Sequence, residues 1–203
     1  MATEQPTFFT RFPGFGDPQI LNTDCFIRAA SVLPEFFSLW GSRFFLLKSD
    51  VNGNMKKIAA ASTDSSTSNL KDLLAYEASK NRAQRDSSGS VGLLWLIRSF
   101  ELLVAILTQL SKSDAQETSL RPIIVKAYDE TLRKHHTGLM RKTFHFLMHS
   151  LPRRQAFIKK LALDQDGRDE LVLAECARVS AEMKPYLTRV HNLLVEYGME
   201  KEV

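Results

Sequence analysis

The stretch Val91–Ser111, which reads VGLLWLIRSFELLVAILTQLS, decides the fold of this chain. Apolar side chains cover nearly its whole circumference, interrupted only by Arg98, Ser99, Glu101, Thr108 and Gln109. A helix that is apolar on nearly all sides belongs in the centre of a fold. Because Arg98 and Glu101 break the apolar run well short of a membrane span, we expect a buried core helix rather than a transmembrane one.

The rest of the chain also has the pattern of helices. Glycine and proline are scarce, at 9 and 7 residues, and no long run alternates apolar and polar side chains as a half-buried strand does. We expect helices over 23–32, 45–61, 69–82, 91–111, 121–150 and 168–197, with a turn over 34–40, a short helix ending at 161 and a bend at Pro185. The sequence therefore predicts one all-α domain over 21–203 after an irregular lead-in over 1–20.

The composition is that of an ordinary globular domain. Of 203 residues, 44% are hydrophobic and 25% are charged, which fits one domain or at most two small ones. The chain has 27 Lys and Arg against 23 Asp and Glu, for a formal charge of +4. This mild excess suits a surface that visits anionic membranes and gives little support to nucleic-acid binding, so we expect no nucleic-acid partner.

The cysteines and the first residues favour the cytoplasm. Cys25 and Cys176 lie in unrelated apolar contexts, which is not the pattern of a disulfide framework. Residues 1–6, MATEQP, do not form a basic segment followed by an apolar run, as a signal peptide would. We therefore expect a cytoplasmic protein with reduced thiols.

A polar cluster is formed by Asp50, Asn54 and Lys57, at positions i, i+4 and i+7. On a helix these side chains share one face within about two turns. A carboxylate accepts hydrogen bonds, an ammonium donates them and an amide does both. This mixture suits a ligand with several hydroxyls and an amide. By spacing alone, however, a solvated helix face with a charge pair is the more frequent explanation.

Metal binding and catalysis find little support in the sequence. Asp50, Asn52 and Asn54 match three ligand positions of a calcium loop, but Gly53 falls at the fourth position instead of the sixth, and Ala61 stands where a glutamate is needed. His145 and His149 have the spacing of a zinc pair, but no third ligand is evident near them. We also find no phosphate loop and no nucleophile elbow. We therefore expect no metal, no cofactor and no catalytic residue, so the protein is not an enzyme.

Trp95, Arg98 and His136 are further candidates, each with a simpler explanation. A tryptophan in such a helix is most often a core residue, but an indole face can also stack on a sugar ring. Arg98, one turn on, is most simply an arginine at the edge of a layer. An inward-facing histidine, here His135 or His136, is more often a satisfied core residue than a ligand-binding one.

Taken together and in order, these pieces resemble the glycolipid transfer protein family. The resemblance is carried by Leu33–Phe37 (LPEFF), Asp50–Ile58 (DVNGNMKKI), Leu94–Arg98 (LWLIR) and Ala127–His136 (AYDETLRKHH). It extends from about residue 26 to about residue 161, with looser agreement to the C-terminus. Each piece alone is weak, but the combination is specific.

The resemblance implies a two-layer helical sandwich of about eight helices that encloses one lipid. Members of the family carry sphingolipids between membranes without energy input. By position in the motifs, Asp50 would accept from the ceramide amide and His136 would donate to its carbonyl. Asn54 and Lys57 would bind sugar hydroxyls, and Trp95 would stack under the first sugar.

The resemblance also implies an apolar channel for the lipid chains and a surface that meets membranes. For the channel we expect side chains such as Leu47, Val91, Leu102, Leu132 and Phe144. The family's mammalian members have a membrane-docking aromatic residue two places after the site histidine, where this chain has Gly138 followed by Leu139. Docking is therefore expected to use other apolar groups, such as Trp40 or phenylalanines near the opening, with help from Arg141 or Lys142.

For the headgroup the resemblance leaves two classes open, because the fold also carries phosphosphingolipids. Relatives that carry ceramide-1-phosphate have cationic residues in place of the tryptophan. This chain keeps Trp95 and Asn54, which favours a neutral glucosyl-, galactosyl- or lactosylceramide, while Lys57 and Arg98 (a possible secondary headgroup contact) keep a phosphate open. We expect a monomer that visits membranes reversibly, either as a carrier or as a lipid sensor or scaffold.

Overall fold

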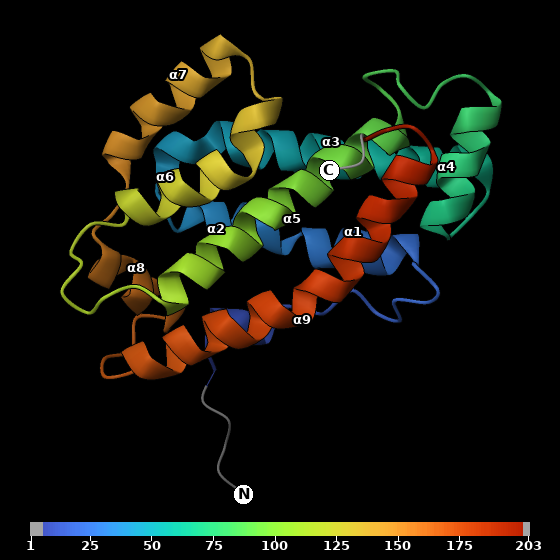
Figure 1. Ribbon diagram of the computed structural model, residues 1–203. Helices are drawn as coiled ribbons and strands as arrows, with labels where there is room; N and C mark the ends of the chain where they lie inside the picture. Colours follow the sequence, from blue (N-terminus) through green and yellow to red (C-terminus); the bar gives the residue numbers. More distant parts are fainter. Residues whose placement is uncertain (1–5, 201–203) are drawn as a thin grey trace, which may run out of the picture.

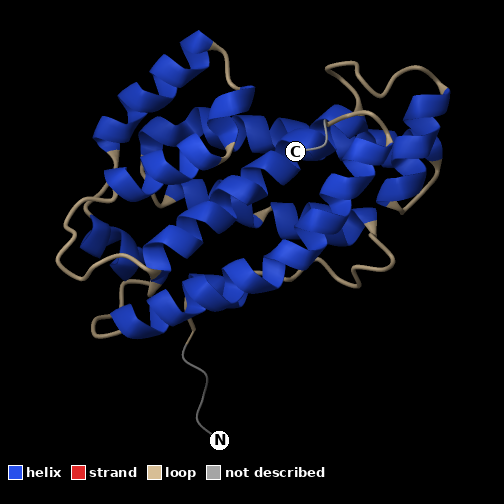
Figure 2. Cartoon of the chain, viewed as in Figure 1, coloured by secondary structure: helices blue, strands red, loops and turns tan. Residues whose placement is uncertain are grey.

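The computed structural model describes residues 6–200, and this part of the chain contains helices, turns and loops but no β-strand (Figure 2). The predicted all-α class is therefore confirmed. The α-helices are α1 (Thr23–Ala30), α2 (Val32–Ser38), α3 (Phe45–Ser65), α4 (Leu70–Ser79), α5 (Gly89–Ser111), α6 (Arg121–Glu130), α7 (Gly138–Leu147), α8 (Arg154–Leu161) and α9 (Asp169–Glu196). Short 3-10 helices are η1 (Phe8–Arg11), η2 (Ser42–Phe44), η3 (Leu132–His135) and η4 (Met148–Ser150).

The helices form two layers, with α5 at the centre of the molecule (Figure 1). In the view of Figure 1, α6, α5 and α9 lie in front of α1, α2 and α3. Within the front layer α5 packs against α9 on one side and α6 on the other, and across the layers it packs against α3 and α2. This is the two-layer sandwich that the family resemblance implies.

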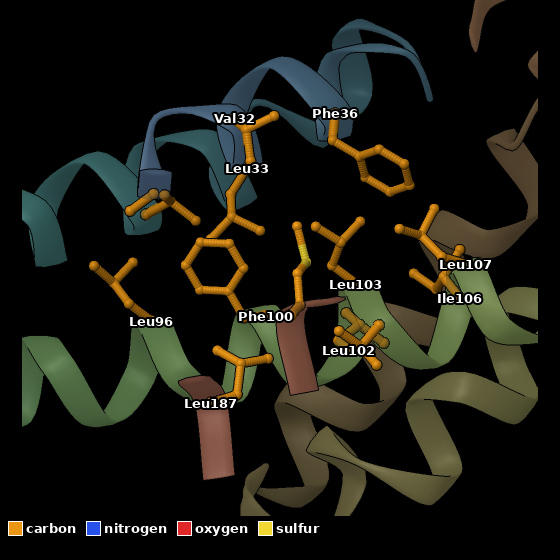
Figure 3. Close-up of a cluster of buried hydrophobic side chains, with 14 of the residues drawn as sticks. Val32, Leu33, Phe36, Leu96, Phe100, Leu102, Leu103, Ile106, Leu107 and Leu187 are labelled. Carbon is orange, nitrogen blue, oxygen red and sulfur yellow. The ribbon is translucent and has the colours of Figure 1, made fainter. Parts of the chain in front are cut away.

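The core lies between these layers, because α5 presents apolar side chains both to α2 and to α9. Figure 3 shows α2 directing Leu33 and Phe36 toward Phe100 and Leu103 of α5, with Leu187 of α9 reaching the same cluster. The side chains of Leu33, Phe36 and Phe100 have no solvent exposure. We expected Arg98 and Glu101 to make the apolar run too short for a membrane span, but α5 has the length and composition of one. Most of the helix is nevertheless buried inside the fold. It is the core helix.

The predicted long helix over 121–150 is wrong, because the chain turns twice within it. Thr131 leaves the helical region at φ −120° and ψ −83°, and its hydroxyl bonds the carbonyl of Ala127 at 2.7 Å. A side chain that binds the local backbone in this way competes with helix continuation. Thr137 then caps a new helix by accepting from the backbone N–H of Met140. The break separates α6, η3 and α7.

Other helix boundaries lie close to the prediction, but the segment predicted as a turn over 34–40 belongs largely to the helix α2. Asn22 caps α1 and Asn69 caps α4, each through its side-chain oxygen. The helix α3 continues to Ser65, past the predicted end at 61, and α9 runs through Pro185. Nine α-helices in residues 6–200 compare with about eight predicted.

The segment over residues 6–20 is largely irregular, but it contributes to the core. Phe8, Phe9 and Phe15 are buried there. The ring of Phe15 stacks on Tyr186 of α9, with centroids 4.3 Å apart and planes 7° apart. These aromatic contacts fix the chain before α1 against the last helix.

Candidate functional site

The polar cluster of α3 forms a hydrogen-bonded ladder along one face of the helix. Asn54 donates from Nδ2 to Asp50 Oδ2 at 3.1 Å, and Lys57 donates from Nζ to Asn54 Oδ1 at 3.1 Å. Asn54 is only 2% exposed, whereas Asp50 is exposed and Lys57 half-buried. The ladder therefore holds the three groups in a fixed order, with the carboxylate open to a ligand.

Two glycines of α5 set how closely the ladder lies to the central helix. A Cβ atom at Gly92 would lie 2.7 Å from the backbone oxygen of Asn54 and 3.1 Å from Lys57 Cβ. A Cβ atom at Gly89 would lie 2.5 Å from Ala61 Cβ. Only a residue without a side chain permits such an approach, so the two helices are in backbone contact at the ladder.

The same contacts show that Trp95 lies level with Asp50. Gly89 faces Ala61 of α3, and Gly92, further along α5, faces the earlier residue Asn54. The two helices are therefore antiparallel. One turn further along α5 is Trp95, and one turn before Asn54 on α3 is Asp50. The antiparallel register brings the indole and the carboxylate to the same level.

Trp95 is half-buried and lies close to two other candidate site residues. Its ring centroid is 6.0 Å from that of His136, with the planes tilted by 35°. The guanidinium carbon of Arg98 lies 4.9 Å from the Trp95 ring centroid, within the range of a cation–π interaction. The structure thus brings together His136, from the segment after η3, with the residues of α3 and α5.

Tyr128 determines which nitrogen of His136 is free for a ligand. Its hydroxyl lies 3.1 Å from His136 Nδ1, and its own ring is fully buried and stacks on Phe144 at 3.6 Å between centroids. When the hydroxyl donates to Nδ1, the proton of the neutral imidazole is on Nε2. His136 then presents an N–H donor, as the expected role toward a carbonyl requires.

The electrostatic surroundings favour a neutral His136. Burial lowers the pKa of His136, and the positive charges of Arg141 and Arg98 lower it further. Burial also raises the pKa of the Tyr128 hydroxyl, which keeps its proton. At Asp50, desolvation by the surrounding protein raises the pKa, opposed by Lys57 and by the hydrogen bond from Asn54.

Arg98, the possible secondary headgroup contact, already has an anionic partner. Glu200 Oε2 accepts from its Nη2 at 2.6 Å and from its Nε at 3.0 Å. The sequence alone predicts no role for Glu200 or for Tyr128. Tyr128 lies in the family motif, so its proximity to His136 was a usable signal, but no local pattern connects Glu200 with α5.

The predicted channel residues fall into two groups. Leu102, Leu132 and Phe144 are buried in the core, at 2%, 8% and 5% exposure. Leu47 and Val91 are half-buried at the surface. Leu132 and Phe144 flank the chain segment that carries His136, and Val91 precedes Trp95 by one turn of α5. Phe144, which stacks on Tyr128, therefore lies next to the polar site.

Trp40 is not available for membrane docking, contrary to one expectation. It is 2% exposed and packs edge-on against Phe44 and Phe36, because it closes the apolar cluster behind α2. The apolar side chains that do reach solvent near the site lie at the start of α3 and along α7. They are Phe45, Leu46, Leu139, Met140 and Phe146, at 62%, 54%, 75%, 44% and 70% exposure. We call these five the apolar rim.

The two parts of the apolar rim belong to one end of the molecule. Arg43 donates from Nη1 to Ser150 Oγ at 3.1 Å, which ties η2 to η4. The start of α3 follows η2 directly, and α7 precedes η4 directly. Arg43 and Lys142 are exposed beside the rim. Within residues 6–200 no three His, Cys, Asp or Glu side chains come close enough to hold a metal ion.

The structure thus combines a helical sandwich with a set of hydrogen-bonding groups and an indole beside its apolar interior, and comparison with known proteins identifies the class. A family model described as glycolipid transfer protein (GLTP) matches residues 21–163. A glycolipid transfer protein of Aureobasidium melanogenum is 32% identical over 177 residues, covering 85% of this chain and 79% of the relative.

Solved structures agree with the sequence comparisons. HET-C2, a fungal glycolipid transfer protein, has a TM-score of 0.76 and 26% identity, covering 93% of this chain and 96% of its own. Mouse ceramide-1-phosphate transfer protein has the same fold, with a TM-score of 0.81 and 20% identity, covering 95% of this chain and 97% of its own. The chain belongs to the glycolipid transfer protein family. It is thus a lipid transfer protein and not an enzyme.

Proposed function

We propose that this protein carries glycosphingolipids of the glucosyl-, galactosyl- or lactosylceramide class between membranes, one molecule at a time. The observation that supports this proposal is the alignment of the ladder Asp50–Asn54–Lys57 with Trp95 and His136. The set offers hydrogen-bond partners for both ends of an amide, partners for hydroxyls and an indole. A ceramide with a sugar headgroup needs all three.

Each group of the set has a role that follows from its chemistry. The open carboxylate of Asp50 accepts from the ceramide N–H, and His136, neutral and held by Tyr128, donates to the ceramide carbonyl. Leaving either end of a buried amide unpaired would cost about 1–3 kcal/mol. Asn54 and Lys57 meet sugar hydroxyls, and the apolar face of the sugar stacks on Trp95. The lipid chains enter the apolar interior, where each methylene contributes about 0.8 kcal/mol.

Ceramide-1-phosphate is the second candidate cargo. Lys57 supplies a cation at the site, and a ceramide-1-phosphate transfer protein shares the fold. A phosphate dianion is bound best by several cationic side chains at once. Trp95 occupies the centre of this site and Arg98 is already paired with a carboxylate, so the neutral sugar is favoured.

The apolar rim is the proposed contact with membranes, at their cytoplasmic surface. Five exposed apolar side chains beside Arg43 and Lys142 combine insertion into the lipid interface with attraction to anionic headgroups. Such binding is shallow and reversible. We propose that the protein acts as a monomer, because a rim covered by a second copy would not reach the bilayer.

A vesicle-to-vesicle transfer assay tests the proposal. Fluorescent galactosylceramide, ceramide-1-phosphate and phosphatidylcholine are compared for wild type, Trp95→Ala and Trp95→Phe. We expect wild type to transfer galactosylceramide and Trp95→Ala to be slower by roughly tenfold or more, since a stacking platform contributes about 1–3 kcal/mol. Trp95→Phe keeps a ring and should retain part of the rate.

Stability measured on the same proteins separates a site role from a core role. A fully buried tryptophan costs about 3–5 kcal/mol on truncation, and half-buried Trp95 should cost less. Loss of folding in step with loss of transfer would assign Trp95 to the core. Transfer of ceramide-1-phosphate instead of galactosylceramide would establish the second candidate, and no transfer of any lipid would favour a sensor.

A further inference from the structure

Next to the indole of Trp95, the positive charge of Arg98 is balanced by the carboxylate of Glu200, which lies 102 positions later in the chain. The two hydrogen bonds to Glu200 Oε2 are 2.6 and 3.0 Å long, and the two side chains are only 12% and 15% exposed. The same guanidinium lies over Trp95. The pair is therefore shielded from solvent and from salt at the edge of the candidate headgroup site.

The backbone after α9 places Glu200 there. Gly198 has a φ of +68°, which lets the chain reverse direction after the helix. The N–H of Met199 then bonds the carbonyl of Leu194 at 2.8 Å, and the N–H of Glu200 bonds the same carbonyl at 3.3 Å. Met199 packs against the core. The position of Glu200 is thus built by the fold.

A carboxylate at this position changes which headgroups the site can accept. A phosphate monoester bound over Trp95 would bring its negative charges close to Glu200 and compete with it for Arg98. In a shielded setting the repulsion between like charges is weakly screened. A neutral sugar meets no such repulsion, and its hydroxyls can accept from or donate to either partner. An unfavourable charge is a common way to exclude a competing ligand.

We propose that Glu200 is a specificity-determining residue that disfavours anionic sphingolipid headgroups by neutralising Arg98. The inference rests on the proposed function, because it needs the headgroup to lie over Trp95. It assigns selectivity to a residue at the end of the chain, outside the polar ladder of α3.

Charge removal at Glu200, with a matched control, tests this inference. Glu200→Gln keeps an oxygen that can accept from Arg98 but removes the negative charge. Glu196→Gln makes the same change of charge at the end of α9, where the 57% exposed side chain is 4.0 Å from Lys71. Transfer of galactosylceramide and of ceramide-1-phosphate is measured for both variants and for wild type at one salt concentration.

The expected result is a change in selectivity for one variant only. Glu200→Gln should raise the ratio of ceramide-1-phosphate to galactosylceramide transfer by roughly fivefold or more. The reason is that the negative charge of Glu200 repels the phosphate headgroup and does not repel the neutral sugar. Glu196→Gln should leave the ratio within about twofold. Glu200→Asp keeps the charge and should keep a ratio close to that of wild type, even if it packs less well.

Three outcomes would overturn the inference. They are an unchanged ratio in Glu200→Gln, an equal rise in Glu196→Gln, and efficient ceramide-1-phosphate transfer by wild type. If wild type transfers galactosylceramide while Glu200→Gln leaves the ratio unchanged, only the role of Glu200 fails. If wild type transfers no galactosylceramide, the proposed function fails first. Thermal unfolding identifies a variant that has lost its fold, and in that case the ratio for Glu200→Asp decides between charge and packing.

Discussion

At the scale of single residues, His136 connects two chemically different parts of the site. Its ring lies beside Trp95, and its Nδ1 faces the buried hydroxyl of Tyr128. Burial and the positive charges of Arg141 and Arg98 lower its pKa, and burial lowers that of neighbouring His135 as well. A ring held neutral by its surroundings can keep one fixed tautomer, which a directed hydrogen bond to a carbonyl needs.

A neutral His136 predicts a pH-dependent stability. Since the folded state lowers its pKa, the unfolded chain binds the proton first as the pH falls below the ordinary histidine value of about 6.5. The free energy of unfolding should therefore decline from pH 7.5 to pH 5.5. His136→Gln should decline less steeply. Urea unfolding at several pH values measures both slopes.

His149→Gln is the control for this prediction, because His149 is exposed on η4. It should keep the pH dependence of wild type. Asp50 and Glu101 have raised pKa values, and they add stability as the pH falls, so the comparison has to be made between variants and not on wild type alone. Parallel slopes for wild type and His136→Gln would show that His136 is protonated equally in both states.

The residues of the site differ in how far the sequence alone could predict them. Asp50, Asn54 and Lys57 are close in sequence, so helical periodicity places them on one face. The contact of Trp95 with His136 joins distant segments, and only the family motif pointed to it. The pair of Arg98 and Glu200 spans 102 positions. No local rule predicts such a pair, since it depends on where α9 ends relative to α5.

At the scale of elements, the contact of α3 with α5 decides whether the site exists. The glycines at positions 89 and 92 let the two backbones meet, so that Asn54 and Lys57 lie against the turn before Trp95. Sequence patterning places both helices correctly. It does not reveal that the glycines are contact points, because a glycine near a helix start also fits a simple boundary.

Gly92→Ala should disturb both stability and transfer. Its new Cβ would lie 2.7 Å from the backbone oxygen of Asn54, and backbone cannot move aside cheaply. Overpacking of this kind costs about 1–3 kcal/mol. The forced separation would also move the ladder away from Trp95, so galactosylceramide transfer should fall by more than the folded fraction does. Denaturant unfolding and the transfer assay measure the two effects.

Gly53→Ala is the matched control on the same helix pair. Gly53 lies inside α3, where a new Cβ would have no atom within 4 Å apart from its chain neighbours and the backbone of its own helix. Alanine should therefore raise the free energy of unfolding by about 0.5–1 kcal/mol through helix propensity and leave transfer unchanged. If Gly92→Ala behaved in the same way as Gly53→Ala, the close approach of the helices would not matter for the site.

The break between α6 and α7 is the largest difference between the predicted and the observed helices. Residues 121–150 have few glycines or prolines, so a continuous helix was the reasonable prediction. The interruption comes from Thr131, which bonds its own turn, and from Thr137, which caps the next helix. The break has a consequence for the site, because a continuous helix would not place His136 beside both Tyr128 and Trp95.

At the scale of the whole molecule, cargo has to pass between the bilayer and a site on the protein surface. The apolar rim at the start of α3 and along α7 lies at the end of the molecule where η2 is tied to η4. The sequence predicts membrane contact in part at Trp40, but Trp40 is buried, and the residues next to it in the sequence give no sign of that burial. Exposure is a property of the assembled layers, so the rim became visible only in the structure.

The apolar rim predicts that vesicle binding depends on Phe45 and Phe146. The double variant Phe45→Ser with Phe146→Ser removes the two largest exposed side chains of the rim, at 62% and 70% exposure. Binding to anionic vesicles in a flotation assay should fall by roughly tenfold or more, because each aromatic ring contributes about 1 kcal/mol or more to an interface. Exposed positions of this kind change the stability by only about 0.5 kcal/mol.

Ile20→Ser provides the control, because Ile20 is 56% exposed and its carbonyl accepts from Asn69 at the start of α4. It is an exposed apolar residue that lies outside the rim, so its loss should leave vesicle binding within about twofold of wild type. Reduced binding by the rim variant alone would show that the end of the molecule bearing α7 faces the membrane. Equal binding by both variants would mean that charge alone brings the protein to the bilayer, and the rim would then have no part in docking.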